Sequence, residues 1–178
     1  MRSYIHTFDH ELTKWVQSGP EWLRPIMLMA TTVGHPVVTI GIAMAILGYG
    51  WARSNMRLVV AAVVASGTLG IGTLIKLLLH RERPLTDYVL LKQFSSFSFP
   101  SGHTVGSTVV FGLVAYLLWG LLPAPWNWIS ALVLTMLIIA VGVSRIYLGA
   151  HYPSDVVAGW LLGLIGLLII IFIVRPTL

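Results

Sequence analysis

Long apolar runs separated by short polar stretches dominate the hydropathy pattern of this chain. A helix needs about 20 predominantly apolar residues to span the hydrocarbon core of a bilayer. The runs that reach this length or come close to it cover residues 58–79, 104–122, 126–143 and 156–174. The pattern therefore predicts a transmembrane helix in each of these four segments.

A fifth run, residues 37–51, is shorter but almost wholly apolar. Residues 22–33 are apolar too, and Gly34-His35-Pro36 separates the two pieces. Glycine and proline together interrupt a helical pattern. The earlier piece is thus either a half-span or a separate short helix, and we expect five to six spans in total.

An amphipathic segment precedes the apolar runs, and residues 1–20 are expected to form its helix. The apolar residues that recur there near helical spacing are Ile5, Phe8, Leu12, Trp15 and Val16. Such a helix favours the membrane interface, although an ordinary cap on the bundle would give the same pattern. The segment has no apolar core of signal-peptide length, so a cleaved targeting sequence is not expected.

Composition argues against a water-soluble fold. Hydrophobic residues make up 57% of the chain and charged residues only 10%, whereas soluble domains carry roughly 25% charged residues. From residue 103 onward the charged residues are Arg145, Asp155 and Arg175. We expect an all-α integral membrane protein with one domain over residues 1–178. Its helical bundle would cover residues 22–178 and include a long loop over residues 80–102.

The formal net charge is +5 and the chain has no cysteine. Without cysteine, neither a disulfide nor a thiolate metal site can form. The eleven Lys and Arg residues are scattered, without a basic run or a nucleic-acid-binding motif. Nucleic acid is therefore not expected as a partner. A basic balance suits an anionic membrane surface or an anionic substrate.

Polar residues gather in three clusters, which alternating spans would bring to one face of the membrane. The first runs from Lys76 to Pro84, at the outer end of the 58–79 span, and the second covers residues 99–103. The third covers residues 144–155, between the last two spans. Convergence of three separate hairpin ends predicts a functional site at that face.

Cationic side chains are prominent in the first and third clusters. Lys76 and Arg83 could be interfacial anchors that extend toward the headgroups. Arg145 is harder to explain in this way, because it follows an uninterrupted apolar run where an ionisable group is costly. It needs an anionic partner, for which Asp155 and a bound anion are the candidates.

The second cluster, Pro100-Ser101-Gly102-His103, indicates a loop that enters a helix. Unpaired backbone N–H groups at a helix N-terminus favour an anion, and Gly102 would let an oxygen approach the backbone closely. Plain capping of the helix by Ser101 is the alternative explanation.

His151 and Asp155 lie four residues apart, and Pro153 is suited to begin the last helix. A carboxylate on one ring nitrogen of a histidine fixes the tautomer and leaves the other nitrogen free to attack. With His103 in another loop, one histidine could attack phosphorus and the other could protonate the leaving alkoxide. Arginine, lysine and backbone N–H groups would stabilise the phosphoryl oxygens. These residues fit phosphoryl transfer, and they require no metal or other cofactor.

The three clusters resemble the signature of the type 2 phosphatidic acid phosphatase family, in the forms KxxxxxxRP, PSGH and SRxxxxxHxxxD. Every fixed position is present, and the resemblance covers about residues 30–175. It implies that His151 is a nucleophile that forms a phosphohistidine, that Asp155 orients it, and that His103 is the general acid. The motif positions that it implies for phosphate binding are Lys76, Arg83, Ser101, Gly102 and Arg145.

Within that family the chain is most similar to bacterial phosphatidylglycerophosphate and undecaprenyl-pyrophosphate phosphatases. These usually have six spans, the first of which is absent here or replaced. The implied activity is metal-independent hydrolysis of a lipid phosphate or diphosphate, with phosphatidic acid as a further candidate substrate. The expected partners are this substrate and membrane lipids, with no obligate protein partner.

Three other functions fit part of the pattern. A phosphotransferase would pass the phosphate from the phosphohistidine to an acceptor instead of water. A vanadate-dependent haloperoxidase has a similar anion pocket, but those proteins are soluble. A transporter or channel would spread its ionisable residues along the spans, whereas here they collect at one face.

Short-loop positive residues indicate the orientation. Arg53 and Arg57 flank the turn before the 58–79 span, which puts that turn in the cytoplasm. Alternating spans then place the 80–102 loop and the turn over residues 149–154 on the outer or periplasmic side of the cell membrane. The positive residues in the outer loop are an exception to the excess of Lys and Arg in cytoplasmic loops. Binding of an anionic substrate would explain them.

Overall fold

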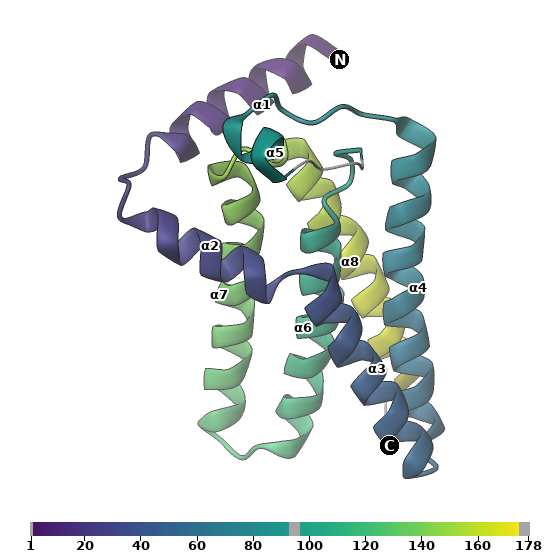
Figure 1. The fold of residues 1–178 in the computed structure, drawn as a ribbon. Coiled ribbons are helices and arrows are strands. Elements are labelled where there is room, and N and C mark those ends of the chain that lie inside the picture. The colour runs from purple at the N-terminus through teal and green to yellow at the C-terminus, as the bar shows by residue number, and fades with distance from the viewer. Residues whose placement is uncertain (1, 93–96, 175–178) are drawn as a thin grey trace.

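The computed structural model of the chain describes residues 2–92 and 97–174, and these residues form helices and connecting loops without a strand. Figure 1 shows the helices in chain order. They are α1 (Arg2–Gln17), α2 (Leu23–Val33), α3 (Pro36–Ala52), α4 (Met56–Leu79), α5 (Asp87–Lys92), α6 (Gly102–Leu121), α7 (Trp126–Tyr147) and α8 (Pro153–Val174). The expected all-helical fold is confirmed.

Five helical stretches of the described chain are long and apolar enough to cross a membrane. Four of them are single helices, namely α4, α6, α7 and α8, and the fifth, Leu23–Ala52, contains α2 and α3. α7 and α8 extend further toward the third polar cluster than hydropathy predicts. Hydropathy ends a span at the first charged residue, whereas the backbone of α7 stays helical through Arg145.

Residues 23–33 form the separate short helix α2, and Trp22 is its N-cap. Figure 1 shows α2 crossing the upper part of the bundle while α3 descends through it. His35 is the N-cap of α3, and its Nδ1 accepts a hydrogen bond from the backbone N–H of Val37 at 3.2 Å. Pro36 follows at the first helical position, where its missing N–H costs nothing. Gly34 packs so closely against Val141 of α7 that a Cβ would not fit.

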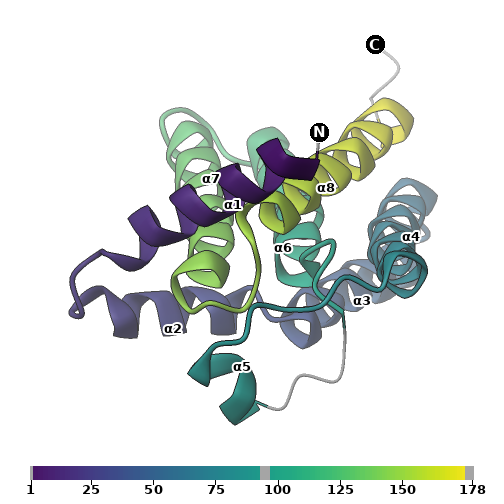
Figure 2. The ribbon, with the colours of Figure 1, turned by 90° about the horizontal axis from the view of Figure 1, so that it is seen from above.

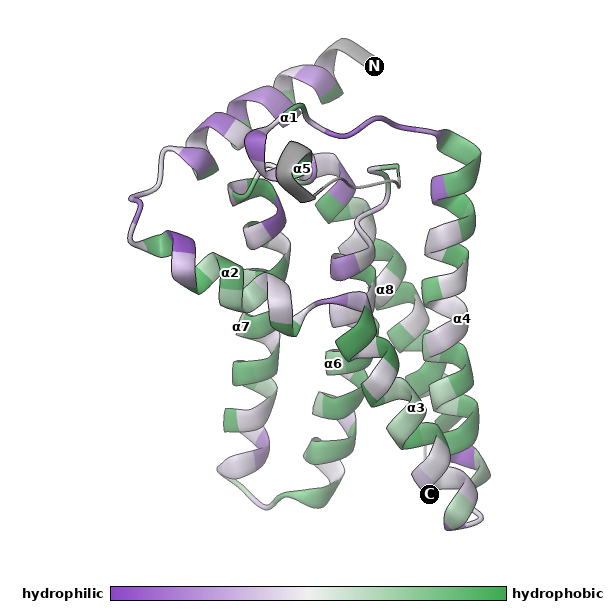
Figure 3. Ribbon diagram, in the orientation of Figure 1, coloured by the Kyte–Doolittle hydropathy of each residue, from purple (hydrophilic) through white to green (hydrophobic). Residues whose placement is uncertain are grey.

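α6 is the central helix of the bundle. It packs against α3, α4, α7 and α8, and all its residues from Thr104 to Leu113 are buried. Apolar side chains on the outer faces are exposed, for example Leu132 at 60% and Phe172 at 78%, as expected where lipid replaces water. Figure 3 shows hydrophilic residues concentrated at the upper end, around α1 and the loop after α4.

α1 lies across this upper end (Figures 1 and 2) and contacts α7 and α8. Its apolar residues Tyr4, Phe8 and Trp15 remain exposed. The two explanations of the amphipathic pattern are therefore compatible, because the helix caps the bundle and still presents apolar side chains to an interface.

Glycines in α8 allow a close approach to α6. A Cβ on Gly163 would lie 2.9 Å from the carbonyl oxygen of Val105, and one on Gly159 would lie 3.0 Å from that of Ser101. Backbone atoms cannot rotate away as a side chain can. The close packing brings together the N-terminal ends of α6 and α8, which carry the second and third polar clusters.

Gly163→Ala should lower the stability of the detergent-solubilised protein by about 1–3 kcal/mol, the usual cost of overpacking. Gly41→Ala in α3 is the matched control, because a Cβ there would meet no atom within 4 Å. Thermal unfolding followed by circular dichroism measures the difference. Equal melting temperatures for the two variants would contradict the tight packing of α6 on α8.

Candidate active site

The three polar clusters converge at the upper end of the bundle. Figures 1 and 2 show the C-terminal ends of α4 and α7 and the N-terminal ends of α6 and α8 at the same end of the bundle, where the loop after α4 crosses from α4 toward α5. A cavity of about 600 Å³ lies at this end. The predicted site residues on its wall are Lys76, Arg83, Gly102, His103 and His151.

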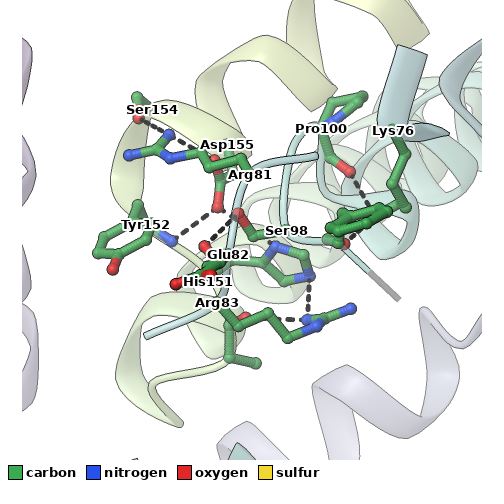
Figure 4. A network of polar contacts seen from close by, with 12 residues as sticks. Lys76, Arg81, Glu82, Arg83, Ser98, Pro100, His151, Tyr152, Ser154 and Asp155 are labelled. Carbon is green, nitrogen blue, oxygen red and sulfur yellow. Dashed lines mark hydrogen bonds and ion pairs between the residues drawn. The ribbon is translucent and has the colours of Figure 1, made fainter. Parts of the chain in front are cut away.

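His151 lies in the turn between α7 and α8 and is buried (Figure 4). Its Nδ1 is 3.5 Å from Oδ2 of Asp155, an electrostatic contact longer than a normal hydrogen bond. Its Nε2 is 3.1 Å from Nη1 of Arg83. A guanidinium can only donate, so Nε2 accepts this bond and carries the lone pair. The proton of the neutral ring is therefore assigned to Nδ1, on the side of Asp155.

Burial and neighbouring cations keep this ring neutral. Loss of solvation lowers the pKa of His151 well below its usual value of 6.5, and the charges of Arg145, Arg83 and Lys76 lower it further. The pKa of Arg83 is lowered to about 10, mainly by burial and then by the charge of Arg145. At neutral pH the site thus holds a neutral histidine beside a charged guanidinium.

Asp155, at the start of α8, is fully buried. Its Oδ1 forms an ion pair of 2.6 Å with Nη1 of Arg81, and its Oδ2 accepts the backbone N–H of Tyr152 at 3.0 Å. The carboxylate thus takes its cation from the loop after α4, and it is not the anionic partner expected for Arg145.

Arg145 is only 1% exposed within α7. Its Nη1 donates to the hydroxyl of Thr31 in α2, and its guanidinium lies 5.9 Å from the ring centroid of Tyr88. Neither neighbour is a carboxylate. The described residues that line the cavity do not include Arg145 or Ser101.

Lys76 points into the protein rather than toward the headgroups. Its Nζ donates to the carbonyl oxygens of Phe97 at 2.8 Å and Pro100 at 2.9 Å (Figure 4). These bonds tie the end of α4 to the loop that enters α6. The interpretation of Lys76 as a simple interfacial anchor is therefore wrong.

Ser101 occupies the N-cap position of α6 without a capping bond from its side chain. Its Oγ is buried and has no hydrogen-bond partner within the described ranges. Its backbone N–H donates to the carbonyl oxygen of Asp155 at 3.1 Å, which links the starts of α6 and α8. The next residue, Gly102, faces open space, because a Cβ there would meet no atom within 4 Å. Capping by the Ser101 side chain is thus not observed.

His103, in the first turn of α6, lines the cavity together with His35. The two ring centroids are 5.3 Å apart, and the ring planes are nearly perpendicular at 89°. Because Nδ1 of His35 accepts the N–H of Val37, a neutral His35 ring carries its proton on Nε2. The α2–α3 junction therefore adds a third histidine to the site.

Sequence reasoning missed several residues that contact the motif positions, among them Thr31, His35 and Arg81. His35 stood out only as part of a helix interruption, and Arg81 only as one positive residue of a loop. The contacts that distinguish them are made across helices. Along the chain, no local pattern indicates these contacts.

The end of the cavity wall that is formed by Lys76, Arg83 and the first turn of α6 carries two cations and backbone N–H donors. Preorganised donors of this kind stabilise an anion and the charge that develops on it. Within residues 2–92 and 97–174, no three His, Cys, Asp or Glu side chains are grouped closely enough to hold a metal ion. The arrangement can bind a phosphate group and present it to the lone pair of His151.

The neutrality of His151 predicts a pH dependence of stability. Because the pKa of the folded state lies below that of the unfolded state, the unfolded chain binds more protons in between. The neutral His151 ring therefore does not lower the free energy of unfolding above pH 6.5. Below pH 6.5 that free energy falls, by at most about 1.4 kcal/mol per pH unit, because protons bind the unfolded chain preferentially. Between pH 7.5 and 5 the melting temperature should fall more for the wild type than for His151→Gln. His6→Gln, at an exposed position of α1, controls for loss of a histidine as such. An equal fall in the wild type and His151→Gln would contradict the buried neutral ring.

The PAP2 superfamily model matches residues 54–177. Phosphatidylglycerophosphatase B of Bacillus subtilis is 32% identical over 152 residues, which cover 81% of this chain and 71% of that protein. Undecaprenyl-diphosphatase of Sulfolobus acidocaldarius is 32% identical over 162 residues, which cover 88% and 73% of the two chains. Both relatives are named as phosphatases, and the enzyme class expected from the sequence is confirmed.

Two solved structures have a similar fold. One is a transmembrane PAP2-type phosphatidylglycerolphosphate phosphatase from Bacillus subtilis, with a TM-score of 0.78 and 26% identity over 94% of this chain and 84% of that one. LpxE of Aquifex aeolicus has a TM-score of 0.68 at 20% identity, over 91% and 93% of the two chains. The second likeness concerns the fold alone. The match of the family model over most of the chain, supported by these relatives, shows that this chain belongs to the PAP2 superfamily.

Proposed function

We propose that this PAP2 superfamily member hydrolyses a lipid phosphate or diphosphate through a phosphohistidine on His151, without a metal ion. The observation that carries the proposal is the environment of His151. Its ring is neutral, its Nδ1 side faces Asp155, and its Nε2 lone pair meets Arg83 at 3.1 Å on a cationic cavity wall. A nucleophile and an anion-binding group thus lie next to each other.

In the first step, Nε2 of His151 attacks phosphorus. The P–N bond forms while the bond from phosphorus to the leaving lipid oxygen breaks, and His103, which is protonated once the phosphate anion lies beside it, gives its proton to that oxygen. Arg83 leaves Nε2 and donates to a phosphoryl oxygen instead. The Nδ1 proton remains on the ring, where the charge of Asp155 stabilises the cationic phosphohistidine.

In the second step, water attacks the phosphohistidine. His103, now neutral, takes a proton from the water as the P–N bond breaks and inorganic phosphate leaves. Both histidines thereby return to their starting protonation states. The groups proposed to stabilise the phosphoryl oxygens during both steps are Lys76, Arg83, Ser101, Gly102 and Arg145.

A lipid substrate is supported by the remainder of the cavity. Away from its polar wall it is lined by apolar residues of α3 and α4, including Ile40, Met44 and Leu69, and by the small residues Gly70 and Gly72. Such a lining suits an acyl or isoprenoid tail. The two relatives act, by their names, on phosphatidylglycerophosphate and undecaprenyl diphosphate. We propose a substrate of this kind, with the phosphate at the histidines and the tail between α3 and α4.

Phosphate release tests the proposed reaction. Purified wild-type protein should release inorganic phosphate from phosphatidic acid, phosphatidylglycerophosphate or undecaprenyl pyrophosphate, with EDTA present and no acceptor added. His151→Ala should lower kcat by several orders of magnitude, because the covalent nucleophile is lost. His6→Ala, on the exposed face of α1, is the control.

Three results would contradict the proposal. Turnover by folded His151→Ala at the wild-type rate would exclude the phosphohistidine. Activity that EDTA removes and Mg²⁺ restores would exclude the metal-free reaction. A requirement for a lipid or sugar acceptor would identify a phosphotransferase instead.

The proposed tail position can be tested at Gly70. Gly70→Leu would fill the apolar part of the cavity between α3 and α4. It should raise KM for a long-tailed lipid phosphate about tenfold, equivalent to losing the burial of about two CH₂ groups. Turnover of a small phosphate ester such as p-nitrophenyl phosphate should not change. Gly67→Leu is the matched control, because Gly67 is also exposed on α4 and a Cβ there meets no atom within 4 Å. Equal KM values for the two variants would place the tail elsewhere.

We also propose that the active site faces the outer or periplasmic side of the cell membrane. The turn between α3 and α4, which carries Arg53, lies at the opposite end of the bundle from α1 and α5 (Figure 1). Short loops rich in Lys and Arg face the cytoplasm. The orientation of this turn therefore decides the orientation of the site.

Single cysteines can report this orientation, since the chain has none of its own. Leu85, 91% exposed in the loop after α4, marks the end of the bundle that carries the site, and exposed Ser54 marks the opposite end. Ser96, in the same long loop as Leu85, lies outside the described residues. In intact cells an impermeant maleimide should label Leu85→Cys and spare Ser54→Cys. The reverse pattern would place the site in the cytoplasm.

A further inference from the structure

Asp9 is the one residue of α1 that is buried among those whose side chains are described, with 4% exposure. An amphipathic helix that only rested on the bundle would bury apolar side chains. A buried carboxylate is costly unless ion pairs and hydrogen bonds compensate its lost hydration. Asp9 must therefore be held by specific partners.

Those partners lie at the start of α8 and in the loop after α4. Oδ1 of Asp9 accepts the backbone N–H of Ser154 at 2.8 Å, and its Oδ2 accepts the Ser154 hydroxyl at 2.8 Å. The same Oδ2 forms an ion pair of 2.7 Å with Nη2 of Arg81. One side chain of α1 thus binds two separate segments of the site.

Arg81 connects Asp9 to the site. Its Nη1 lies 2.6 Å from Oδ1 of Asp155, and Asp155 in turn faces Nδ1 of His151 at 3.5 Å. The guanidinium also lies 4.4 Å above the ring of Tyr152, which restricts its plane. A continuous series of contacts therefore leads from Asp9 through Arg81 and Asp155 to His151.

The position of Arg81 indicates support rather than substrate binding. Among the described residues, the wall of the 600 Å³ cavity includes Arg83 and Lys76 but not Arg81. Arg81 instead lines a separate cavity of about 750 Å³ beneath α1, together with Asp9 and Tyr152. Without Asp9, the guanidinium would keep Asp155 as its carboxylate partner among the described residues and the Ser154 hydroxyl at 2.7 Å, but it would lose its tie to α1.

We propose that Asp9 is a positioning residue for the reaction, which through Arg81 fixes the carboxylate of Asp155 and with it the ring of His151. This inference rests on the proposed function, because it assigns Asp9 to the orientation of the proposed nucleophile. It makes docking of α1 on the bundle a condition of full activity.

Asp9→Asn is the decisive variant, because an asparagine can still accept the N–H of Ser154 but loses the charge that pairs with Arg81. With a lipid phosphate from which the wild type releases phosphate, kcat should fall on the order of 10- to 100-fold, as when a partner that orients a functional histidine is lost. KM should stay within about twofold, because the phosphate-binding wall is unchanged. Glu11→Gln on the same helix, where the exposed acid contacts only His10 among the described residues, should leave both constants unchanged.

Rescue and coupling distinguish positioning from a merely structural role. Asp9→Glu should recover part of kcat, because it restores the charge. Arg81→Lys keeps a cation but replaces the two guanidinium nitrogens, one on Asp9 and one on Asp155, with a single nitrogen. It should therefore show the same loss of kcat at constant KM. If Asp9→Asn does not fold, Arg81→Lys is judged by the same criterion. The double variant should lose no more than the worse single variant. Wild-type kcat in folded Asp9→Asn, or a raised KM at unchanged kcat, would overturn the inference and leave the proposed phosphatase reaction standing.

Discussion

The site depends on holding several cations at the membrane surface mostly through neutral acceptors. Lys76 is held by two carbonyl oxygens and Arg145 by the Thr31 hydroxyl, whereas the carboxylates of Asp9 and Asp155 pair with Arg81. Carbonyl and hydroxyl oxygens satisfy N–H donors without cancelling their charge. The cavity therefore keeps a surplus of positive charge, which suits a phosphate dianion and lowers the pKa of His151.

This surplus requires that distant parts of the chain be held close together. Gly163 and Gly159 let α8 lie against α6, and the N–H of Ser101 then donates to the carbonyl oxygen of Asp155. Lys76 adds a second tie, from the end of α4 to the loop before α6. Because the same contacts close the bundle and shape the cavity, packing and site geometry are not separable in this fold.

The upper end of the bundle divides into two regions on either side of His151. On one side lies the cavity, where Arg83 meets Nε2 and apolar residues of α3 and α4 continue the wall. On the other side, Asp155 faces Nδ1 and is itself held by Arg81. The Nε2 side of the ring thus borders the cavity that would hold a substrate, and the Nδ1 side is held by contacts within the protein.

Hydropathy and motif spacing alone determined the helical membrane fold, the long spans and the convergence of the three clusters, because spans of fixed length must alternate across a bilayer. The same reasoning predicted a site around His151, His103 and Asp155. Tertiary structure alone decided that Asp155 pairs with Arg81 rather than Arg145, that His35 joins the site, and that Asp9 of α1 reaches it. Such contacts depend on how helices rotate and loops fold back on them, and a periodic pattern along one segment carries no information about the neighbour that it will meet.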